Sequence, residues 1–248
     1  MPESKPCSLS AFFPAYNDAK SLPELLERTY EVISRLTSDY EVIVINDGST
    51  DDTAAVLANL SKRYTATLRV ITHSINRGYG GALKSGFSAS TKDLVFYTDG
   101  DGQYDVRELE ALWEKMRSDV DVVNGYKLNR GDGWKRALIG NTYNWIIRRL
   151  FNIKIRDVDC DFRLIRRAVL NQVELVSNTG SICLELVKKL QNRHSRFEEV
   201  GVNHYPRAHG RSQFFRLNSV FATLCQLVVL YPTLSIDALR TREIRGNE

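Results

Sequence analysis

The chain has 248 residues, of which 43% are hydrophobic and 26% charged, a composition typical of a folded globular protein. Its formal net charge is only +4, with 34 basic and 30 acidic residues, so no nucleic-acid partner is expected. Four widely spaced cysteines argue against a disulfide framework and favour a reducing compartment. The sequence has neither a secretory signal nor an apolar run long enough for a transmembrane helix, which predicts a cytoplasmic protein.

Short apolar segments alternate with helical patterns along the first half of the chain, which predicts an α/β fold with a mostly parallel sheet. Apolar residues recur at helical spacing over 22–36 and 106–116. The expected strands are Leu9–Phe13, Glu41–Ile45, Leu68–Thr72, Leu94–Thr98 and Val120–Asn124.

The second half is less regular. A polar loop over 127–133 leads into a helical pattern over 134–151. We expect next, in order, a hairpin around 158–165, a helix over 182–191, a strand over 197–205 and an apolar helix over 217–236. No linker rich in Gly, Pro or Ser separates these parts, so a single domain over 1–248 is expected, with 1–125 and 126–216 as its two halves.

Two aspartates one residue apart follow the fourth expected strand. Side chains at i and i+2 of an extended chain point the same way, so Asp99 and Asp101 can converge on one cation, with the Gln103 amide oxygen as a third ligand. Oxygen ligands of this kind suit Mg²⁺ or Mn²⁺. Gly100 and Gly102 would let a diphosphate approach the backbone closely. A simple turn after a buried strand would give the same pattern, so the motif alone leaves both interpretations open.

Polar motifs follow the other strands as well, and the carboxyl ends of parallel strands share one edge of a sheet. The first strand is followed by Pro14–Asp18, the second by Asn46–Asp52 and the third by Asn76–Ala82. Asp47 is an acceptor-only group, suited to a base, to a ribose hydroxyl or simply to a turn. The glycines of 78–81 match neither the dinucleotide nor the P-loop spacing, which disfavours an NAD-dependent oxidoreductase.

Taken in order, the segments 14–18, 46–51 and 99–103 resemble the inverting glycosyltransferases of family 2, and more narrowly the dolichyl-phosphate mannose synthase group. The similarity is strongest over the first 125 residues and continues more weakly through 157–163 and 204–212. It implies a GT-A nucleotide-sugar-binding fold, Rossmann-like, with residues 1–125 as the donor half and the C-terminal portion on the acceptor side.

The same resemblance implies roles for individual residues. Asp99 and Asp101 would be catalytic, and Asp99, Asp101 and Gln103 would hold Mg²⁺ or Mn²⁺. The sequence departs from the family pattern at Asp18, where Glu is usual, and at Asn46, which replaces the first of two aspartates. The nucleotide-sugar donor would contact Pro14, Ala15, Tyr16, Asp18, Asp47, Asn76, Lys84, Asp99, Gly100 and Asp101.

A phosphate acceptor is already anionic near neutral pH, so it needs cationic residues rather than a general base. The candidates are Lys127, Arg136, Arg207 and Arg211. The apolar and basic residues of 134–151 and 217–231 would suit a membrane interface. The expected reaction therefore moves a sugar from a GDP- or UDP-sugar to a polyisoprenyl phosphate, dolichyl or undecaprenyl in type, by an enzyme peripheral at the cytoplasmic membrane face.

Two alternatives stay open at this point. The acceptor could be a soluble or saccharide hydroxyl, in which case Asp161 or Glu185 would serve as the general base. The chain could also be a non-catalytic nucleotide-sugar-binding module, although the intact pair Asp99 and Asp101 argues against that reading.

Overall fold

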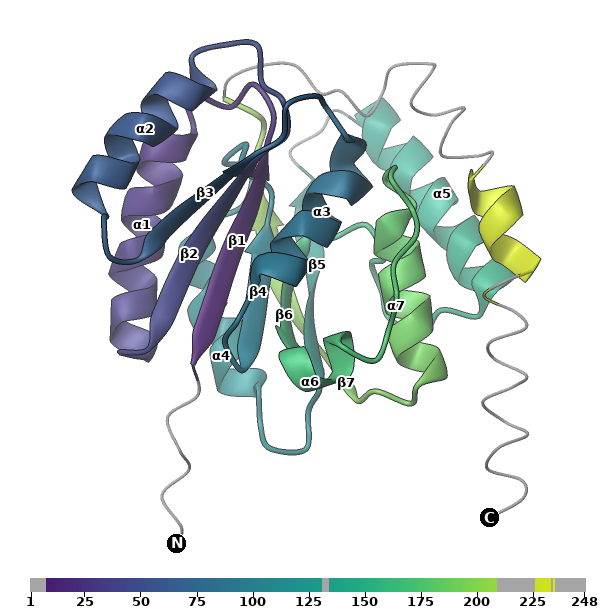
Figure 1. Cartoon of the computed structure of the whole chain (residues 1–248). Helices are drawn as coiled ribbons and strands as arrows, with labels where there is room; N and C mark the ends of the chain where they lie inside the picture. The colour runs from purple at the N-terminus through teal and green to yellow at the C-terminus, as the bar shows by residue number, and fades with distance from the viewer. Residues whose placement is uncertain (1–7, 131–133, 209–225, 233, 235–248) are drawn as a thin grey trace, which may run out of the picture.

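The computed structural model describes residues 8–130, 134–208, 226–232 and 234. Within these residues, seven strands form one sheet in the order β3-β2-β1-β4-β6-β5-β7 (Figure 1). Of the six pairs in this described sheet, four are parallel, and β4–β6 and β5–β6 are antiparallel, which confirms the predicted α/β fold and mostly parallel sheet. The strands are β1 (Leu9–Ala15), β2 (Tyr40–Asn46), β3 (Leu68–Thr72), β4 (Leu94–Thr98), β5 (Val122–Arg130), β6 (Phe162–Arg166) and β7 (Phe197–His204).

Helices cover both faces of this sheet (Figure 1). Strand β1 shows how the sequence divides them, because alternate side chains of a strand point to opposite faces. Phe13 is buried with the helices of one face, and Phe12 with those of the other. The face on the side of Phe13 carries α1 (Leu22–Leu36), α2 (Thr53–Arg63) and α4 (Leu109–Lys115). A short 3-10 turn, η1 (Val106–Glu108), precedes α4. The face on the side of Phe12 carries α3 (Gly78–Ala89), α6 (Arg167–Leu170) and α7 (Ile182–Asn192).

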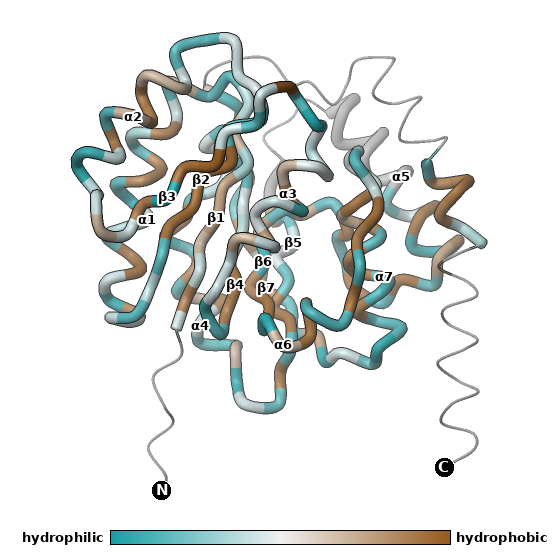
Figure 2. The backbone as a smooth tube through the Cα atoms, viewed as in Figure 1, coloured by the Kyte–Doolittle hydropathy of each residue, from teal (hydrophilic) through white to brown (hydrophobic). Residues whose placement is uncertain are grey.

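A third apolar cluster lies outside the sheet. Helix α5 (Trp134–Phe151) and the helical residues 226–232 pack together and against α7 (Figure 1). Ile147 and Phe151 meet Leu227 and Leu230 there, all of them buried. The colouring of Figure 2 shows apolar stretches of the chain along the strands of the sheet. In the described part of the chain, no helix combines the length and the hydropathy needed to cross a bilayer.

The second half departs from the sequence expectations in two places. The predicted hairpin around 158–165 is wrong: residues 162–166 form the single strand β6, which pairs with β4 and β5 instead of with a strand just before it. Residues 127–130 of the predicted loop belong instead to β5, which runs to Arg130 alongside β7, and residues 131–133 lie outside the described residues. Of the predicted C-terminal helix, residues 226–232 and 234 are helical, and residues 217–225, 233 and 235–236 lie outside the described residues.

The strand order reverses between β1 and β4, and the region at the carboxyl ends of these two strands is here called the crevice. From β1 the chain moves outward to β2 and β3, and then returns to the other side of β1 to form β4. The loops after β1 and β4 both lead to helices on the Phe13 side of the sheet, α1 and α4, and they lie against each other at the carboxyl ends of the strands. Open α/β sheets bind their ligands outside these strand ends, where the strand order reverses.

Close packing of α3 on β1 gives a test of the fold. A Cβ atom on Gly86 would lie 2.2 Å from the ring of Phe12, so Gly86→Ala requires a shift of the helix or of the ring. Helix propensity alone would favour alanine by about 1 kcal/mol, but overpacking of a full core costs about 1–3 kcal/mol, so we expect the variant to be less stable.

Urea unfolding measures this effect, and Ser88→Ala, an exposed position of the same helix, is the matched control. The control should change the free energy of unfolding by less than about 0.5 kcal/mol. A Gly86→Ala protein as stable as the control would contradict the packing described here.

Candidate functional site

The loops after β1 and β4 touch at the crevice. The Gly100 N–H donates to the Pro14 carbonyl at 3.0 Å, and the Ser21 hydroxyl donates to the Gly100 carbonyl at 2.8 Å. A Cβ atom at position 100 would lie 2.7 Å from the Pro14 oxygen, so this close approach requires glycine. Ala15, the last residue of β1, accepts the N–H of Asp47 at 2.9 Å. The segments 14–18 and 99–101 are thus brought together, as the motif order predicts.

The loops after β1 and β2 are also tied to each other. The side-chain oxygen of Asn17, a residue with φ of 59°, accepts the Thr50 N–H at 2.8 Å. In return, the Asn17 N–H donates to the Ser49 hydroxyl at 3.0 Å. The loops after β2, β1 and β4, which are neighbours in the sheet, are therefore connected by hydrogen bonds.

Arg207, which follows β7, reaches these loops from the second half of the chain. Its guanidinium donates to Oδ2 of Asp101 and lies 3.8 Å from Oδ1 of Asp18. Gln103 holds the incoming segment: its backbone carbonyl accepts the Tyr205 N–H at 2.8 Å, and its side-chain amide donates to the Tyr205 carbonyl at 2.9 Å. Arg207, predicted for an acceptor phosphate, thus meets the predicted metal-binding aspartate.

The carboxylates of the crevice are crowded. Burial, together with the negative charge of Asp101, raises the pKa of Asp18 to about 6. Burial likewise raises the pKa of Asp99 well above its ordinary value, with the charges of Asp161 and Asp101 adding to the effect. The Tyr79 hydroxyl, which donates to Oδ1 of Asp99 at 2.7 Å, offsets only part of this. A positive charge beside Asp18, Asp99 and Asp101 is therefore favourable.

These side chains fit a divalent cation that arrives with a phosphate ligand. Among the residues that the structure describes, no group of three or more His, Cys, Asp or Glu side chains forms a complete protein cage for a metal. Mg²⁺ and Mn²⁺ sites of substrate-binding enzymes need no such cage, because one or two carboxylates bind the ion and substrate phosphates supply further oxygens. Asp99 and Asp101 can supply those carboxylates, and the unbalanced negative charge of the crevice suits the ion.

Asp47 lies at the end of β2, where it is 3% exposed. Its Oδ1 accepts the Arg77 N–H at 2.8 Å and lies 2.6 Å from Nδ1 of His73. Asn76, predicted to contact the nucleotide, donates from its side chain to the Asp47 carbonyl at 3.0 Å. Sequence reasoning passed over His73, yet His73 directly follows β3 and the strand-end argument applied to that strand would have found it.

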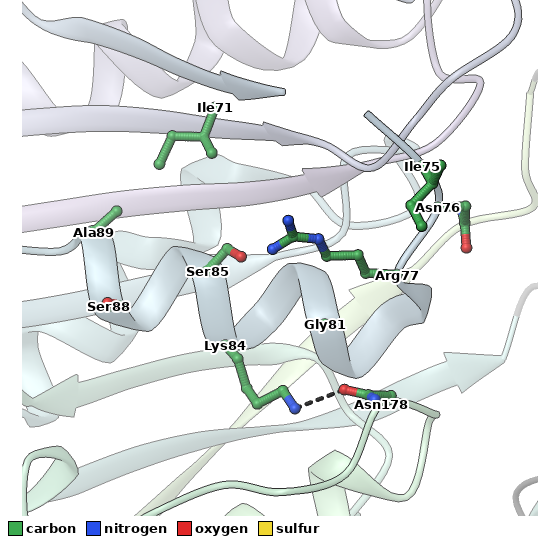
Figure 3. A pocket seen from close by; sticks show the side chains of 10 residues that line it. All are labelled: Ile71, Ile75, Asn76, Arg77, Gly81, Lys84, Ser85, Ser88, Ala89 and Asn178. Atoms are coloured by element: carbon green, nitrogen blue, oxygen red, sulfur yellow. Dashed lines mark hydrogen bonds between the residues drawn. The ribbon is translucent and has the colours of Figure 1, made fainter. Parts of the chain in front are cut away.

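Lys84 lies in a groove beside the crevice (Figure 3). The groove has a volume of about 660 Å³ and runs between α3 and the outer end of the sheet, with Ile71, Arg77 and Ser85 in its lining. The Lys84 ammonium donates to the Asn178 side chain at 2.6 Å and to the Val176 carbonyl at 3.1 Å. Its described partners thus belong to the loop before α7.

The remaining predicted phosphate ligands are placed differently. The Lys127 ammonium donates to the Asp159 carbonyl at 2.7 Å and lies 3.9 Å from the Asp157 carboxylate. Burial alone would lower the pKa of Lys127, but Asp157, Cys160, Asp159 and Asp161 together outweigh burial and the pKa is raised. The side chain of Arg136, on α5, and the whole of Arg211 lie outside the described residues.

The two carboxylates considered as general bases have different surroundings. Glu185 is fully buried, and its oxygens accept the N–H groups of Val176 and Ser177 at 3.0 and 2.9 Å, so it anchors a loop. Asp161 keeps 14% of its side chain exposed and accepts the Cys183 thiol at 3.0 Å. Because Asp161 also raises the pKa of Asp99, it lies close enough to take part in the chemistry of the crevice.

Solved structures with a similar fold are known. Glucosyl-3-phosphoglycerate synthase from Mycobacterium tuberculosis in complex with phosphoglyceric acid gives a TM-score of 0.69 at 18% identity, over 92% of this chain and 80% of that one. The same enzyme in complex with Mn²⁺, UDP-glucose and phosphoglyceric acid gives 0.67 at 19% identity, over 92% and 79%. A further mycobacterial protein gives 0.64 at 19% identity, over 84% and 69%.

The family comparison goes beyond the fold. The family model described as glycosyl transferase family 2 matches residues 10–174. This segment holds β1 to β4 with their strand-end motifs, and also β5, β6 and the loop of Asp157 to Asp161. More than half of the sequence, including the whole carboxylate crevice except Arg207, therefore follows the family pattern, and the chain belongs to glycosyl transferase family 2.

Proposed function

We propose that this protein is a metal-dependent inverting glycosyltransferase that moves a sugar from a UDP- or GDP-sugar to a polyisoprenyl phosphate. The observation that carries the donor side of this proposal is the carboxylate crevice formed by Asp18, Asp99 and Asp101 at the topological switch point. The similar structures solved with Mn²⁺ and UDP-glucose support the same kind of donor and ion.

Each side of the crevice then has a task. A divalent cation held by Asp99, Asp101 and Gln103 would neutralise the charge that develops on the leaving diphosphate. Tyr79 keeps Asp99 in place through its 2.7 Å hydrogen bond. Asp47 accepts N–H or O–H groups of the base or ribose. The segment Pro14–Asp18 forms the wall on the β1 side.

Arg207 connects the donor site with the acceptor side. A guanidinium offers two parallel N–H groups, the geometry that recognises a phosphate. Arg207 sits between Asp18 and Asp101, on a segment that comes from the second half of the chain. From there it is placed to attract a phosphorylated acceptor to the donor sugar.

The lipid nature of the acceptor is supported by one surface. Two helices that pack together, α5 and 226–232, expose a set of large apolar side chains, here called the α5 patch. Arg149, also exposed, lies among them on α5. Apolar and aromatic side chains beside arginine suit the interface of an anionic membrane. The α5 patch consists of Trp145, Ile146, Leu150, Val228, Val229 and Tyr231.

A second candidate keeps the donor site and changes the acceptor. The similar solved structures include complexes with phosphoglyceric acid, a soluble phosphorylated compound. An acceptor hydroxyl would need a general base, and Asp161 is the partly exposed carboxylate near Asp99 that could serve. The α5 patch favours the lipid over this alternative.

Asp101→Asn tests the donor site, because it removes the charge while keeping the shape. We expect Mn²⁺-dependent release of nucleoside diphosphate from the sugar donor to fall about 10²- to 10³-fold. Asp52→Asn is the control: Asp52 is an exposed aspartate at the start of α2, and its side chain makes no capping hydrogen bond there. Undiminished turnover in the Asp101 variant would contradict the proposed site.

The acceptor is tested with Leu150→Glu combined with Val228→Glu. Charges in the α5 patch should lower transfer to polyprenyl phosphate in anionic vesicles at least about tenfold, because the helices no longer insert into the interface. Ala55→Glu combined with Ala58→Glu, two exposed positions on α2, adds the same charge elsewhere and should have no effect. Transfer to phosphoglyceric acid in water, with none to the lipid, would instead establish the second candidate.

Asp18→Asn tests the charge crowding. The native pKa of about 6 lies above the ordinary 3.8, so the folded state holds this proton more tightly and the wild type loses stability as pH rises from about 4 to 6. The amide cannot ionise and still accepts the Tyr16 N–H. We expect the variant to be more stable by about 1–2 kcal/mol near pH 7.5, and the gain to vanish below about pH 4. Urea unfolding at both pH values measures it, and a variant without this gain would refute the crowding.

A further inference from the structure

Three polar side chains from three elements form a line that starts at Asp47. His73, directly after β3, places Nδ1 2.6 Å from Oδ1 of Asp47 and Nε2 2.9 Å from the hydroxyl of Ser85 in α3. Asp47 and His73 are 3% and 4% exposed. Ser85 forms part of the groove lining (Figure 3). The line therefore runs from the groove to the end of β2.

The partners of His73 define its hydrogen bonds. A carboxylate only accepts, so Nδ1 carries the proton that faces Asp47. In the neutral ring, Nε2 then accepts from the Ser85 hydroxyl, and this second bond fixes the orientation and tautomer of the imidazole. The Arg77 N–H adds another donor at 2.8 Å, also on Oδ1. The His73 and Arg77 N–H groups both bond to Oδ1, so they hold the Asp47 carboxylate in one orientation. The direction of its other oxygen, Oδ2, is thereby set as well.

The same residue types activate serine nucleophiles in hydrolases, but the setting here is different. A nucleophilic serine needs N–H donors beside it that stabilise an oxyanion. Ser85 lies inside α3, where the neighbouring N–H groups bond to carbonyls of the helix. The line therefore acts on Asp47 rather than on a substrate in the groove.

We propose that His73 is a positioning residue for the sugar-nucleotide donor: together with Ser85 it orients the Asp47 carboxylate that receives the base or ribose. This inference rests on the proposed function, in which Asp47 binds the donor. A carboxylate that is held in one orientation loses little conformational entropy when the nucleotide binds, and it discriminates between N–H or O–H donors and other groups. The effect should appear in donor affinity, since His73 does not touch the reacting atoms.

Two amide variants separate positioning from packing. In His73→Asn, the amide nitrogen takes the place of Nδ1 and keeps the donor to Asp47. In His73→Gln, the amide reaches the place of Nε2 and keeps the contact with Ser85 but loses that donor. Both leave an uncharged polar side chain of similar size, so a purely structural role would affect them alike. Ser85→Ala removes only the outer hydrogen bond.

The binding of UDP and GDP in the presence of Mn²⁺, measured by calorimetry, is the first readout. The split between KM for the donor and kcat is the second. We expect His73→Gln to raise Kd and KM about tenfold while kcat stays within about threefold, since one buried hydrogen bond to a charged group is lost. His73→Asn should stay within about threefold of wild type, and Ser85→Ala should raise Kd about threefold.

The double variant Asp47→Asn with His73→Gln shows whether His73 acts through Asp47. If His73 acts through Asp47, His73→Gln causes no further loss there, because the two effects are coupled. Equal affinities of the Gln and Asn variants, a kcat effect without a KM effect, or full additivity with Asp47→Asn would overturn the inference. If His73→Gln does not fold, unchanged affinity of Ser85→Ala overturns it.

The proposed function fails in a different way. Wild-type protein that binds neither UDP nor GDP with Mn²⁺, or Asp47→Asn protein that binds them as well as wild type does, would remove the donor role of Asp47 itself. Weak binding by Asp47→Asn together with normal binding by His73→Gln would leave the donor site intact and reject only the role of His73.

Discussion

The close contact between the Gly100 N–H and the Pro14 carbonyl is the constraint on which the rest of the site depends. It joins the loops after β1 and β4 at the point where the strand order of the sheet reverses. Since a side chain at position 100 would collide with the Pro14 oxygen, the two loops can meet only through glycine. The contact brings Asp18 near Asp101, and burial together with the repulsion between these carboxylates raises the pKa of Asp18. A backbone contact thus contributes to the electrostatics of the crevice.

The part of the site that the sequence predicts well is the part set by local geometry. Asp99 and Asp101 follow a strand at a spacing of two residues, and Pro14–Asp18 follows the neighbouring strand, so strand periodicity and the sheet edge place them together. The same strand-end logic would have identified His73 after β3. The bounds of β3 and β4 are the same as those expected from the sequence, residue for residue.

The hairpin prediction that was wrong, and the contacts of Lys127 and Arg207 that the sequence does not indicate, all depend on long-range pairing. Strand β6 lies between β4 and β5, and no local pattern around 158–165 tells a strand that inserts between distant partners from one arm of a hairpin. Lys127 is held by the loop of Asp157 and Asp159, about 30 residues further along the chain. Arg207 meets Asp101 across 106 positions. Charge alone shows that such residues need partners, and only the fold shows which ones.

The links between the loops after β1 and β2 have a consequence for recognition. Asn17 bonds to both Ser49 and Thr50, so the wall around Asp47 is held by the protein itself. A ligand that enters there meets surfaces that are already in place, and little of its binding free energy is spent on reorganising them. Selectivity between bases would then depend on a rigid shape, and changing it would require replacing residues of the wall, because the loops have little freedom to adapt.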